Sequence, residues 1–343
     1  MLMSKKTGES KLNEFGVAVL GAGSWGTALA ILLAGNGIPV KLWGRNARAI
    51  GDMSRLRENQ RYLPGVKLPE LIVPTSDFSA AVRDQQHILL VVPSHSFPTI
   101  LEDIATFQSN SLSLVWGSKG FAPNSGGLLS QLVEARFGDT ATPSVISGPS
   151  FAGEIAIGLP AALTVGAKTL TVAEAVASWF RNDRVRIYTS DDLAGVQLGG
   201  AIKNVMAIAT GISDGLQLGA NSRAALITRG LAEMTRLGQA LGGRMETMMG
   251  LTGVGDLILT CTDDQSRNRR VGLGLGCGKS LAATVAEIGQ EAEGIDATRE
   301  LFHVSQKLAV EMPITTVVYR VLYEGLSPAD AVQALLKREP ARE

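Results

Sequence analysis

A glycine-rich loop near the N-terminus constrains the fold of this chain more than any other segment. The loop Gly21-Ala-Gly-Ser-Trp-Gly26 follows the apolar run 15–20 and precedes a helix predicted over Thr27–Ala34. In such a loop the first glycine permits a tight turn, the second lets a pyrophosphate approach the backbone, and the third lets helix and strand pack closely. Because a helix N-terminus attracts negative charge, the segment predicts a dinucleotide site. A glycine turn without a ligand is the alternative.

The end of the second predicted strand bears on which dinucleotide is bound. A site that prefers NAD usually places an acidic residue there, against the ribose hydroxyl. This chain has Leu42-Trp-Gly-Arg45 instead. A guanidinium cannot accept a hydrogen bond from that hydroxyl, but it can pair with a 2′-phosphate or stack on adenine. The cofactor is therefore predicted to be NAD or NADP, with a solvated surface charge as the alternative for Arg45.

The pattern of apolar runs predicts the fold. From Phe15 to about Thr189, β-rich runs alternate with helical stretches, and their continuous apolar character is typical of strands covered on both faces. The expected strands span 15–20, 39–43, 87–92, 112–116, 143–147, 161–165 and 185–189. Long helical periodicities follow at 192–212, 222–241, 281–290, 296–310 and 328–337. We predict a flexible tail at 1–14, a Rossmann-type doubly wound α/β dinucleotide-binding domain at 15–190, and an all-helical substrate and catalytic domain at 191–343.

Charge and cysteine content exclude several classes of protein. Lys and Arg number 32, equal to Asp and Glu, so the chain lacks the broad basic field that holds nucleic acid. Two cysteines and three histidines do not provide a disulfide framework or a predicted metal site. With a polar N-terminal tail, they favour a cytoplasmic location. The apolar stretch 193–213 carries Gln197, Lys203 and Asn204, which predicts a buried helix and no stable membrane insertion.

Lys203 is the one ionisable side chain in that apolar stretch. Because desolvating an ammonium ion is costly, Lys203 either reaches the surface or is placed for chemistry. Gly199 and Gly200, one turn earlier, are expected to leave room for a substrate or cofactor. A neutral lysine can take a proton from an alcohol, and burial lowers its pKa from about 10.4 toward the working pH. Lys203 therefore suits general acid–base catalysis.

Two later segments supply candidate partners for Lys203 and for a substrate. Asp256, in a glycine-rich turn, is the predicted partner of Lys203, with a helix N-cap as the alternative. Arg267-Asn-Arg-Arg270 concentrates three guanidinium groups and an amide in a chain without net charge. Since a guanidinium matches phosphate oxygens, the segment favours a phosphorylated substrate. A solvated loop neutralised by Asp263 and Asp264 is the alternative.

Three further features have both functional and ordinary interpretations. Lys119 follows the run 112–116, at a strand end where open α/β sheets bind ligands, although an ordinary loop lysine fits equally. His95 also follows a strand, and we interpret it as a structural histidine bound by loop backbone, with cofactor contact as the alternative. The tract Gly272–Ser280 lacks the spacing of a nucleoside triphosphate loop and the strand before it, so we interpret it as a flexible turn.

Taken together, nine motifs resemble those of the NAD(P)-dependent glycerol-3-phosphate dehydrogenase family, bacterial biosynthetic type. They are GAGSWGTALA at 21–30, LWGR at 42–45, VPSHSF at 92–97, SKGF at 118–121, SGPSFA at 147–152, GGAIKNVMAI at 199–208, NSRAALITRGLAEM at 221–234, TGVGDLILTCT at 252–262 and SRNRRVG at 266–272. The resemblance covers nearly the whole chain after Phe15.

The resemblance implies reversible reduction of dihydroxyacetone phosphate to sn-glycerol 3-phosphate for glycerophospholipid synthesis, by a cytoplasmic enzyme that is commonly a homodimer. The implied catalytic residues are Lys203, Lys119, Asp256 and Thr260. The implied substrate-binding residues are Lys119, Gly148, Ser150, Lys203, Asp256, Ser266, Arg267 and Asn268. The expected cofactor contacts, which include the loop glycines, are Gly21, Gly23, Ser24, Trp25, Gly26, Arg45, Lys119, Ala152, Arg267, Glu291 and Glu293.

Two other functions fit part of the pattern. Another two-domain hydroxyacid or sugar-acid dehydrogenase would share the glycine loop but prefer a carboxylate substrate. A nucleotide-sensing regulator would bind NAD(H) without turnover. The glycine loop alone favours a regulator, whereas Lys203 and the arginine segment disfavour it.

Overall fold

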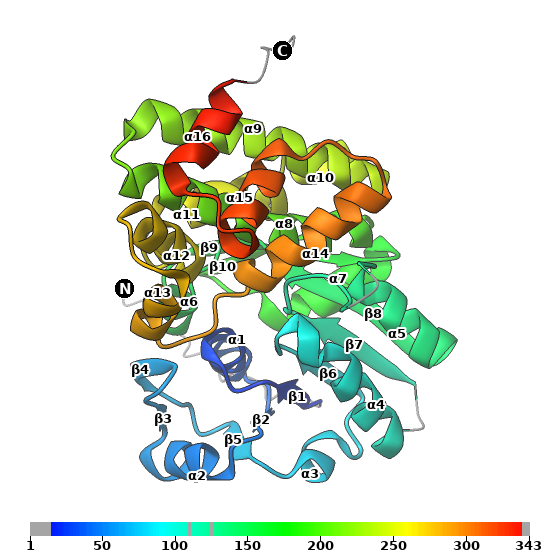
Figure 1. Ribbon diagram of the computed structural model, residues 1–343. Coiled ribbons are helices and arrows are strands. Elements are labelled where there is room, and N and C mark those ends of the chain that lie inside the picture. Colours follow the sequence, from blue (N-terminus) through cyan, green and yellow to red (C-terminus); the bar gives the residue numbers. More distant parts are fainter. Residues whose placement is uncertain (1–14, 109–110, 124–125, 338–343) are drawn as a thin grey trace, which may run out of the picture.

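A computed structural model describes residues 15–108, 111–123 and 126–337, and the predicted tail at 1–14 lies outside these described residues. Figure 1 shows a sheet with its helices in one part of the molecule, and the helices that follow Ser190 gathered beside it. The predicted fold class, a Rossmann-type sheet followed by helices, is confirmed.

In the described residues, eight strands form one sheet in the order β10-β9-β8-β7-β6-β1-β2-β5. Their bounds are β1 (Val17–Leu20), β2 (Val40–Trp43), β5 (Ile72–Thr75), β6 (His87–Leu90), β7 (Leu112–Trp116), β8 (Ala141–Ser147), β9 (Ala161–Ala167) and β10 (Val185–Ser190). All seven expected strands are present, and β5 was not expected. A separate hairpin joins β3 (Glu58–Asn59) to β4 (Leu63–Lys67). The sheet is mixed, because β8 and β9 pair antiparallel while the other neighbours are parallel.

The strand order has a switch point beside β1. From β1 the chain adds β2 and then β5 on one side, whereas β6, β7 and β8 follow on the other. The direction therefore reverses between β1 and β6. In open α/β sheets, ligands bind at such a switch point, beyond the carboxyl ends of the strands. The glycine loop leaves β1 at that end.

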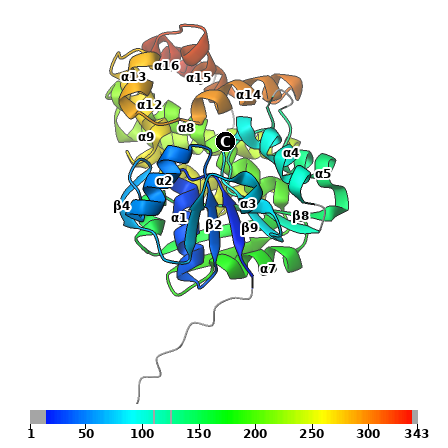
Figure 2. The same cartoon turned by 90° about the horizontal axis from the view of Figure 1, so that it is seen from below.

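Alternate residues of β1 face opposite helical layers. Val17 and Val19 belong to the core that includes residues of α1 (Ser24–Gly35) and α7 (Leu170–Phe180). Ala18 and Leu20 belong to the core with α4 (Phe97–Phe107) and α5 (Leu129–Phe137). Helices thus lie on both sides of the strands (Figure 2), which explains the continuous apolar runs. The shorter helical segments here are α2 (Ala47–Leu56), α3 (Phe78–Val82), η1 (Ser94–Ser96), η2 (Gly138–Thr140) and α6 (Ala152–Ala156).

The second half packs around α8 (Leu193–Gly215), which is buried over most of its length. The other elements are α9 (Gly219–Ala240), α10 (Met245–Met248), the π-helix η3 (Leu251–Gly255), α11 (Asp256–Thr262), α12 (Arg267–Gly276), α13 (Leu281–Ile288), α14 (Gly294–Lys307), α15 (Pro313–Tyr323) and α16 (Pro328–Leu336). The five predicted long helices correspond to α8, α9, α13, α14 and α16. Among the described residues, none of the helices has the length and apolar character needed to cross a membrane.

The interpretation of Gly272–Ser280 as a flexible turn is wrong for its first half, which belongs to α12. There the glycines let two helix backbones touch. A Cβ at Gly272 would lie 2.1 Å from the carbonyl oxygen of Ile208, and a Cβ at Gly211 would lie 2.2 Å from that of Arg269. Real Cβ atoms do not come so close, so glycine serves close packing of α12 against α8.

Candidate active site

The glycine loop has the geometry that a dinucleotide needs. Gly21 has a φ of +121°, and a Cβ there would lie 2.2 Å from the carbonyl oxygen of Val91. A Cβ at Gly26 would lie 1.9 Å from the carbonyl oxygen of Gly21, so with any side chain at position 26 the helix and strand could not pack so closely. By contrast, no atom lies within 4 Å of a Cβ built at Gly23. That open space lies at the N-terminus of α1, which has no side-chain cap, and it fits a pyrophosphate.

Three predicted cofactor contacts surround this loop. Arg45 is exposed and follows the end of β2. A Cβ built at the preceding Gly44 would lie 3.0 Å from Cβ of Ala22, so the backbone at Arg45 lies beside the loop. The Ser24 hydroxyl donates a hydrogen bond to the carbonyl oxygen of Tyr62 at 2.7 Å. Trp25 Nε1 is buried and has no hydrogen-bond partner among the described residues. A Cβ built at Gly117 would lie 2.9 Å from this nitrogen, so the indole packs against the segment that follows β7.

Lys203, Asp256 and Lys119 form a buried ion-pair group across three segments. Lys203 donates to Oδ1 of Asp256, and Lys119 Nζ lies 3.0 Å from Oδ2 of the same carboxylate. Lys203 is 5% exposed and Asp256 1%. Lys203 thus does not reach the surface. Helix α11 begins at Asp256 with Gly255 as its N-cap, so the Asp256 carboxylate binds the lysines and does not cap that helix.

The two lysines titrate differently although they share one carboxylate. Burial is the main cause that lowers the pKa of Lys203 to about 7, with Asp256 opposing this shift and Lys119 reinforcing it. Burial also opposes the charge on Lys119, but its contacts with Asp256 and Lys203 together raise the pKa of Lys119. Near neutral pH, Lys119 therefore stays charged while Lys203 can both give and take a proton.

The π-helix η3 delivers Asp256 to the lysines. A Cβ at Gly253 would lie 1.9 Å from the carbonyl oxygen of Met248, so this tight turn requires glycine. Single π-helical turns often occur at functional sites. After the turn, Thr260 donates through Oγ1 to the backbone carbonyl of Asp256 at 2.6 Å. Thr260 is therefore part of the same buried group.

The expected room for a ligand beside Gly199 and Gly200 is not present. A Cβ at Gly199 would lie 2.1 Å from the carbonyl oxygen of Thr252, in η3. A Cβ at Gly200 would lie 3.0 Å from Oγ of Ser147. These glycines instead allow η3 and the end of β8 to approach α8, and this approach brings Asp256 to Lys203.

The loop after β8 lies beside the same turn. Gly148 has a φ of +134°, which favours glycine, and its carbonyl oxygen accepts from Ser150 Oγ at 3.1 Å. Pro149 Cγ lies 3.7 Å from a Cβ built at Gly255, at the end of η3. Ala152 begins the short helix α6. The loop that carries Gly148, Ser150 and Ala152 therefore reaches the Asp256 segment.

The arginine segment is the first turn of α12. Ser266 is its N-cap and accepts from the backbone N–H of Arg269 at 3.2 Å. Asn268 is buried, and its Oδ1 accepts from the backbone N–H of Gly294 at 2.9 Å. Arg267 Nη1 lies 3.5 Å from Oε1 of Gln290. The segment is thus a helix N-terminus and not a solvated loop, although Asp264 does pair with Arg269, as that alternative supposed.

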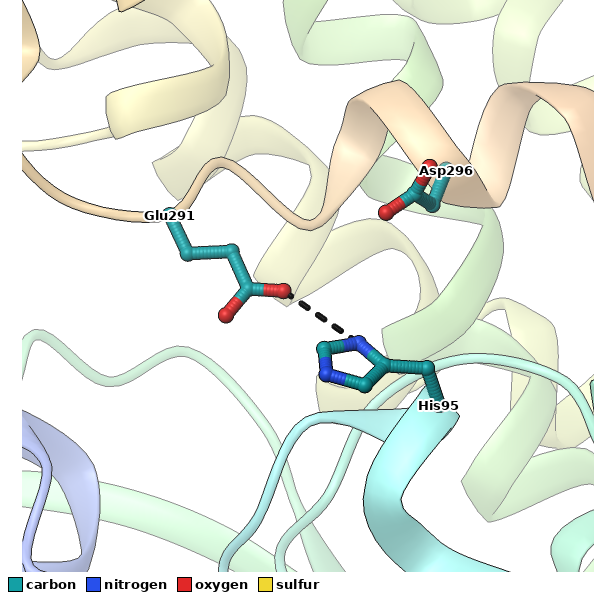
Figure 3. A group of neighbouring side chains, drawn as sticks. All are labelled: His95, Glu291 and Asp296. Carbon is teal, nitrogen blue, oxygen red and sulfur yellow. Dashed lines mark ion pairs between the residues drawn. The ribbon is translucent and has the colours of Figure 1, made fainter.

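His95, Glu291 and Asp296 form an exposed group between the two halves of the molecule (Figure 3). His95 Nδ1 lies 3.5 Å from a carboxylate oxygen of Glu291, and the His95 side chain is 56% exposed. The expected loop-backbone partner is replaced by this ion pair. Glu293 lies nearer the cations: burial raises its pKa, and the charges of Arg267 and Lys119 oppose the rise.

Three polar residues near the site were not predicted: two are buried, and the third, Asp214, is mostly buried. Ser147 Oγ and Thr252 Oγ1 have no hydrogen-bond partner among the described residues, and both lie against the glycines of α8. Ser147 opens the SGPSFA motif and Thr252 opens TGVGDLILTCT, so their positions within quoted motifs were the available signal. Asp214 pairs with Arg269, but nothing in the sequence links positions 55 residues apart.

Comparison with known proteins gives a consistent result. A family model described as NAD-dependent glycerol-3-phosphate dehydrogenase N-terminus matches residues 16–173, and one described as its C-terminus matches 192–333. The glycerol-3-phosphate dehydrogenase (NAD(P)+) of Thioalkalivibrio sulfidiphilus is 55% identical over 94% of this chain and 97% of its own length. That of Nitrosococcus oceani is 51% identical over 94% and 93%. The crystal structure of glycerol-3-phosphate dehydrogenase from Coxiella burnetii is 44% identical, with a TM-score of 0.92 over 94% and 99%.

Proposed function

This chain belongs to the NAD-dependent glycerol-3-phosphate dehydrogenase family, and on that premise we propose which residues perform its reaction. The protein is an oxidoreductase that interconverts dihydroxyacetone phosphate and sn-glycerol 3-phosphate with NAD or NADP. When bound, the nicotinamide supplies or accepts the hydride. The chain itself must orient both ligands and move the proton. The buried group of Lys203, Asp256 and Lys119 is the observation that supports our assignment.

Lys203 handles the proton. In the reduction direction its ammonium donates a proton to the substrate oxygen as negative charge develops there, and in oxidation the neutral amine accepts the hydroxyl proton. Asp256 holds the Lys203 amine in position, and Thr260 fixes the first turn of α11 that carries Asp256. Lys119 keeps its charge and stabilises the developing alkoxide.

Arg267 and Asn268 bind the substrate phosphate at the N-terminus of α12. A guanidinium fork and the free backbone N–H groups of a helix start both favour a phosphate. The Asn268 amide nitrogen remains available, because its oxygen is engaged by Gly294. Ser266, Gly148 and Ser150 complete the substrate pocket in this proposal.

The glycine loop would hold the dinucleotide, with its pyrophosphate in the open space beside Gly23. The proposed cofactor contacts are Gly21, Gly23, Ser24, Trp25, Gly26, Arg45, Lys119, Ala152, Arg267, Glu291 and Glu293. In this arrangement residues 15–190 bind the dinucleotide and residues 191–343 supply the substrate and proton chemistry. The exposed Arg45 favours a cofactor phosphate beside β2.

The proposed role of Lys203 is tested by its substitution. We expect Lys203→Ala to lower kcat by roughly 10²–10⁴-fold, because general acid–base catalysis contributes about that much, while the Kd for NADH changes little. The matched control is Lys279→Ala, a surface lysine paired with Glu287, which should keep wild-type kcat. Near-normal turnover by Lys203→Ala would refute the assignment. Reduction of small keto acids, without reduction of dihydroxyacetone phosphate, would favour a hydroxyacid dehydrogenase instead. Binding of NADH without turnover of any carbonyl substrate would favour a regulator.

The cellular role and assembly are also proposals. We propose that the product supplies the backbone for glycerophospholipids, that the enzyme is cytoplasmic, and that it is a homodimer. The low cysteine content supports the cytoplasmic location, and the family resemblance supports all three proposals. Light scattering coupled to size exclusion tests the assembly: a mass near 72 kDa, twice the 36.1 kDa chain, is expected, and a monomer mass would contradict it.

A further inference from the structure

The three arginines of the α12 N-terminus have different environments. Arg269 is buried, whereas Arg270 is exposed and Arg267 is partly buried. A buried guanidinium requires partners. Arg269 donates to the Asp214 carboxylate of α8, and its Nε lies 2.9 Å from Oδ1 of Asp264. The Arg269 guanidinium is therefore already occupied by two carboxylates and is not free to bind a substrate phosphate.

Asp214 joins the two helices that carry the proposed chemistry. It lies on α8, eleven residues after Lys203, which is about three helical turns, so both side chains leave α8 on nearly the same side. Oδ2 of Asp214 accepts from Arg269 on α12 and also, at 2.9 Å, from Arg223 on α9. The Asp214 carboxylate is mostly buried, with 11% of the side chain exposed.

The glycine contacts fix how α12 lies along α8. A Cβ at Gly215 would lie 2.6 Å from the carbonyl oxygen of Leu273. Likewise, a Cβ at Gly211 would lie 2.2 Å from the carbonyl oxygen of Arg269. The two helices thus run in the same direction in backbone contact. This register brings the first turn of α12 level with the turn of α8 that follows Lys203. Asn204 confirms the neighbourhood: its carbonyl oxygen lies 3.0 Å from a Cβ built at Gly294, whose N–H binds Asn268.

We propose that Asp214 is a positioning residue, which holds Arg269 and thereby sets the distance and orientation of Arg267 and Asn268 relative to Lys203. The inference rests on the proposed phosphate-binding role of the last two residues. The glycines allow α12 to lie in backbone contact with α8, and the Asp214–Arg269 pair holds the helix start in one rotation. Selectivity for a phosphorylated triose over an unphosphorylated one is then a property of this pair as well as of the residues that touch phosphate.

The test compares two substrates in the same variant. We expect Asp214→Asn to lower the ratio of kcat/KM for dihydroxyacetone phosphate to that for dihydroxyacetone by at least roughly tenfold, the lower end for a hydrogen bond to a charged group. The loss should arise from KM for the phosphorylated substrate and from weaker inhibition by inorganic phosphate. At saturating NADH the kcat should stay near wild type, because Lys203 and Asp256 are unchanged.

The matched control is Arg223→Gln, which removes the other partner of Asp214 without touching α12, and which should leave the ratio within about twofold of wild type. An unchanged ratio in Asp214→Asn, or equal losses for both substrates, would overturn the proposal. If circular dichroism shows that Asp214→Asn does not fold, Arg269→Lys is measured against the same criterion. Absence of wild-type turnover of dihydroxyacetone phosphate would refute the proposed function instead, and wild-type turnover with an unchanged ratio would refute the positioning role alone.

Discussion

At the scale of single residues, one carboxylate serves two lysines, and this sharing makes their chemistry unequal. Each oxygen of Asp256 contacts one lysine, in surroundings that exclude most water. A single negative charge cannot fully stabilise two buried ammonium ions. Burial, reinforced by the charge of Lys119, lowers the pKa of Lys203 to about 7, whereas contacts with Asp256 and Lys203 raise the pKa of Lys119. The pair separates into a fixed cation and a titrating acid–base group.

The pH dependence of the two reaction directions follows from this separation. Oxidation of glycerol 3-phosphate requires neutral Lys203, so its kcat should rise with pH through about 7, and the reduction rate should fall over the same interval. Initial rates from pH 5.5 to 9 in both directions measure this. In Lys119→Gln the midpoint should move to higher pH, because one cation that lowers the pKa of Lys203 is gone. An oxidation profile that stays flat across neutrality would contradict the assignment.

Loss of the Arg267 guanidinium tests phosphate recognition at one position. Arg267→Ala should weaken transition-state binding of dihydroxyacetone phosphate by about 1.5–3 kcal/mol, the range for hydrogen bonds to charged groups. At saturating NADH, which removes any effect of Arg267 on cofactor binding, turnover of unphosphorylated dihydroxyacetone should change little. The exposed neighbour gives the control: Arg270→Ala should retain wild-type kcat/KM for both substrates. Equal losses for both trioses in Arg267→Ala would show that this residue does not bind the phosphate.

At the scale of elements, the strands and helices with a clear local pattern could be predicted from the sequence, whereas those that depend on packing against other elements could not. The seven apolar strands and the glycine loop have local signals, and each was found. The strand β5 is no shorter than β1 or β2, but it was missed because it contains Pro74, which a sheet tolerates at its edge. Helix α12 was missed because its glycines lower helix propensity, whereas their value lies in contact with α8.

The site shows the same division. Lys203 and Asp256 stood out as a lone charge and a turn residue, so their candidacy was visible in the sequence. Asp256 was also named as the partner of Lys203, and the two side chains are in contact. The packing that brings them together, with η3 lying against Gly199, had no signal in the sequence. The Arg269–Asp214 pair had no local signal at all. Residue chemistry is therefore predictable from type and setting, but the partner of a buried charge depends on which helices cross.

Substitution of a crossing glycine tests the importance of the α8–α12 contact. In Gly211→Ala the new Cβ would lie 2.2 Å from a backbone carbonyl oxygen, so the helices must separate. We expect the free energy of unfolding to fall by about 1–3 kcal/mol, as for overpacked cores. Gly51→Ala is the control, because it is exposed in α2 with no atom within 4 Å of its Cβ, and it should gain roughly 0.5–1 kcal/mol. Urea unfolding measures both, and equal stability of the two variants would contradict close packing.

At the scale of the whole molecule, a buried carboxylate links the C-terminal helices to the rest of the fold. Glu233 of α9 accepts hydrogen bonds from the backbone N–H of Ile314, at 2.6 Å, and from the N–H and hydroxyl of Thr315, at 3.2 and 3.1 Å. It thereby caps the N-terminus of α15, to which α16 is joined. Burial is the main cause that raises the pKa of Glu233 from 4.5 to about 7, although these hydrogen bonds oppose the rise.

This shifted pKa makes global stability depend on pH. Because the folded pKa lies above the unfolded one, the folded state binds more protons between pH 4.5 and 7, and stability falls as pH rises through that interval. Over the whole interval between the two pKa values of Glu233, the free energy of unfolding falls by about 3 kcal/mol at most. In Glu233→Gln this contribution is absent, so the unfolding free energy of wild type relative to the variant should decline from pH 5 to 8, measured by urea unfolding at each pH. The exposed Glu246→Gln should keep the wild-type slope. Parallel pH profiles for wild type and Glu233→Gln would mean that Glu233 keeps an ordinary pKa and that its hydrogen bonds to α15 outweigh its burial.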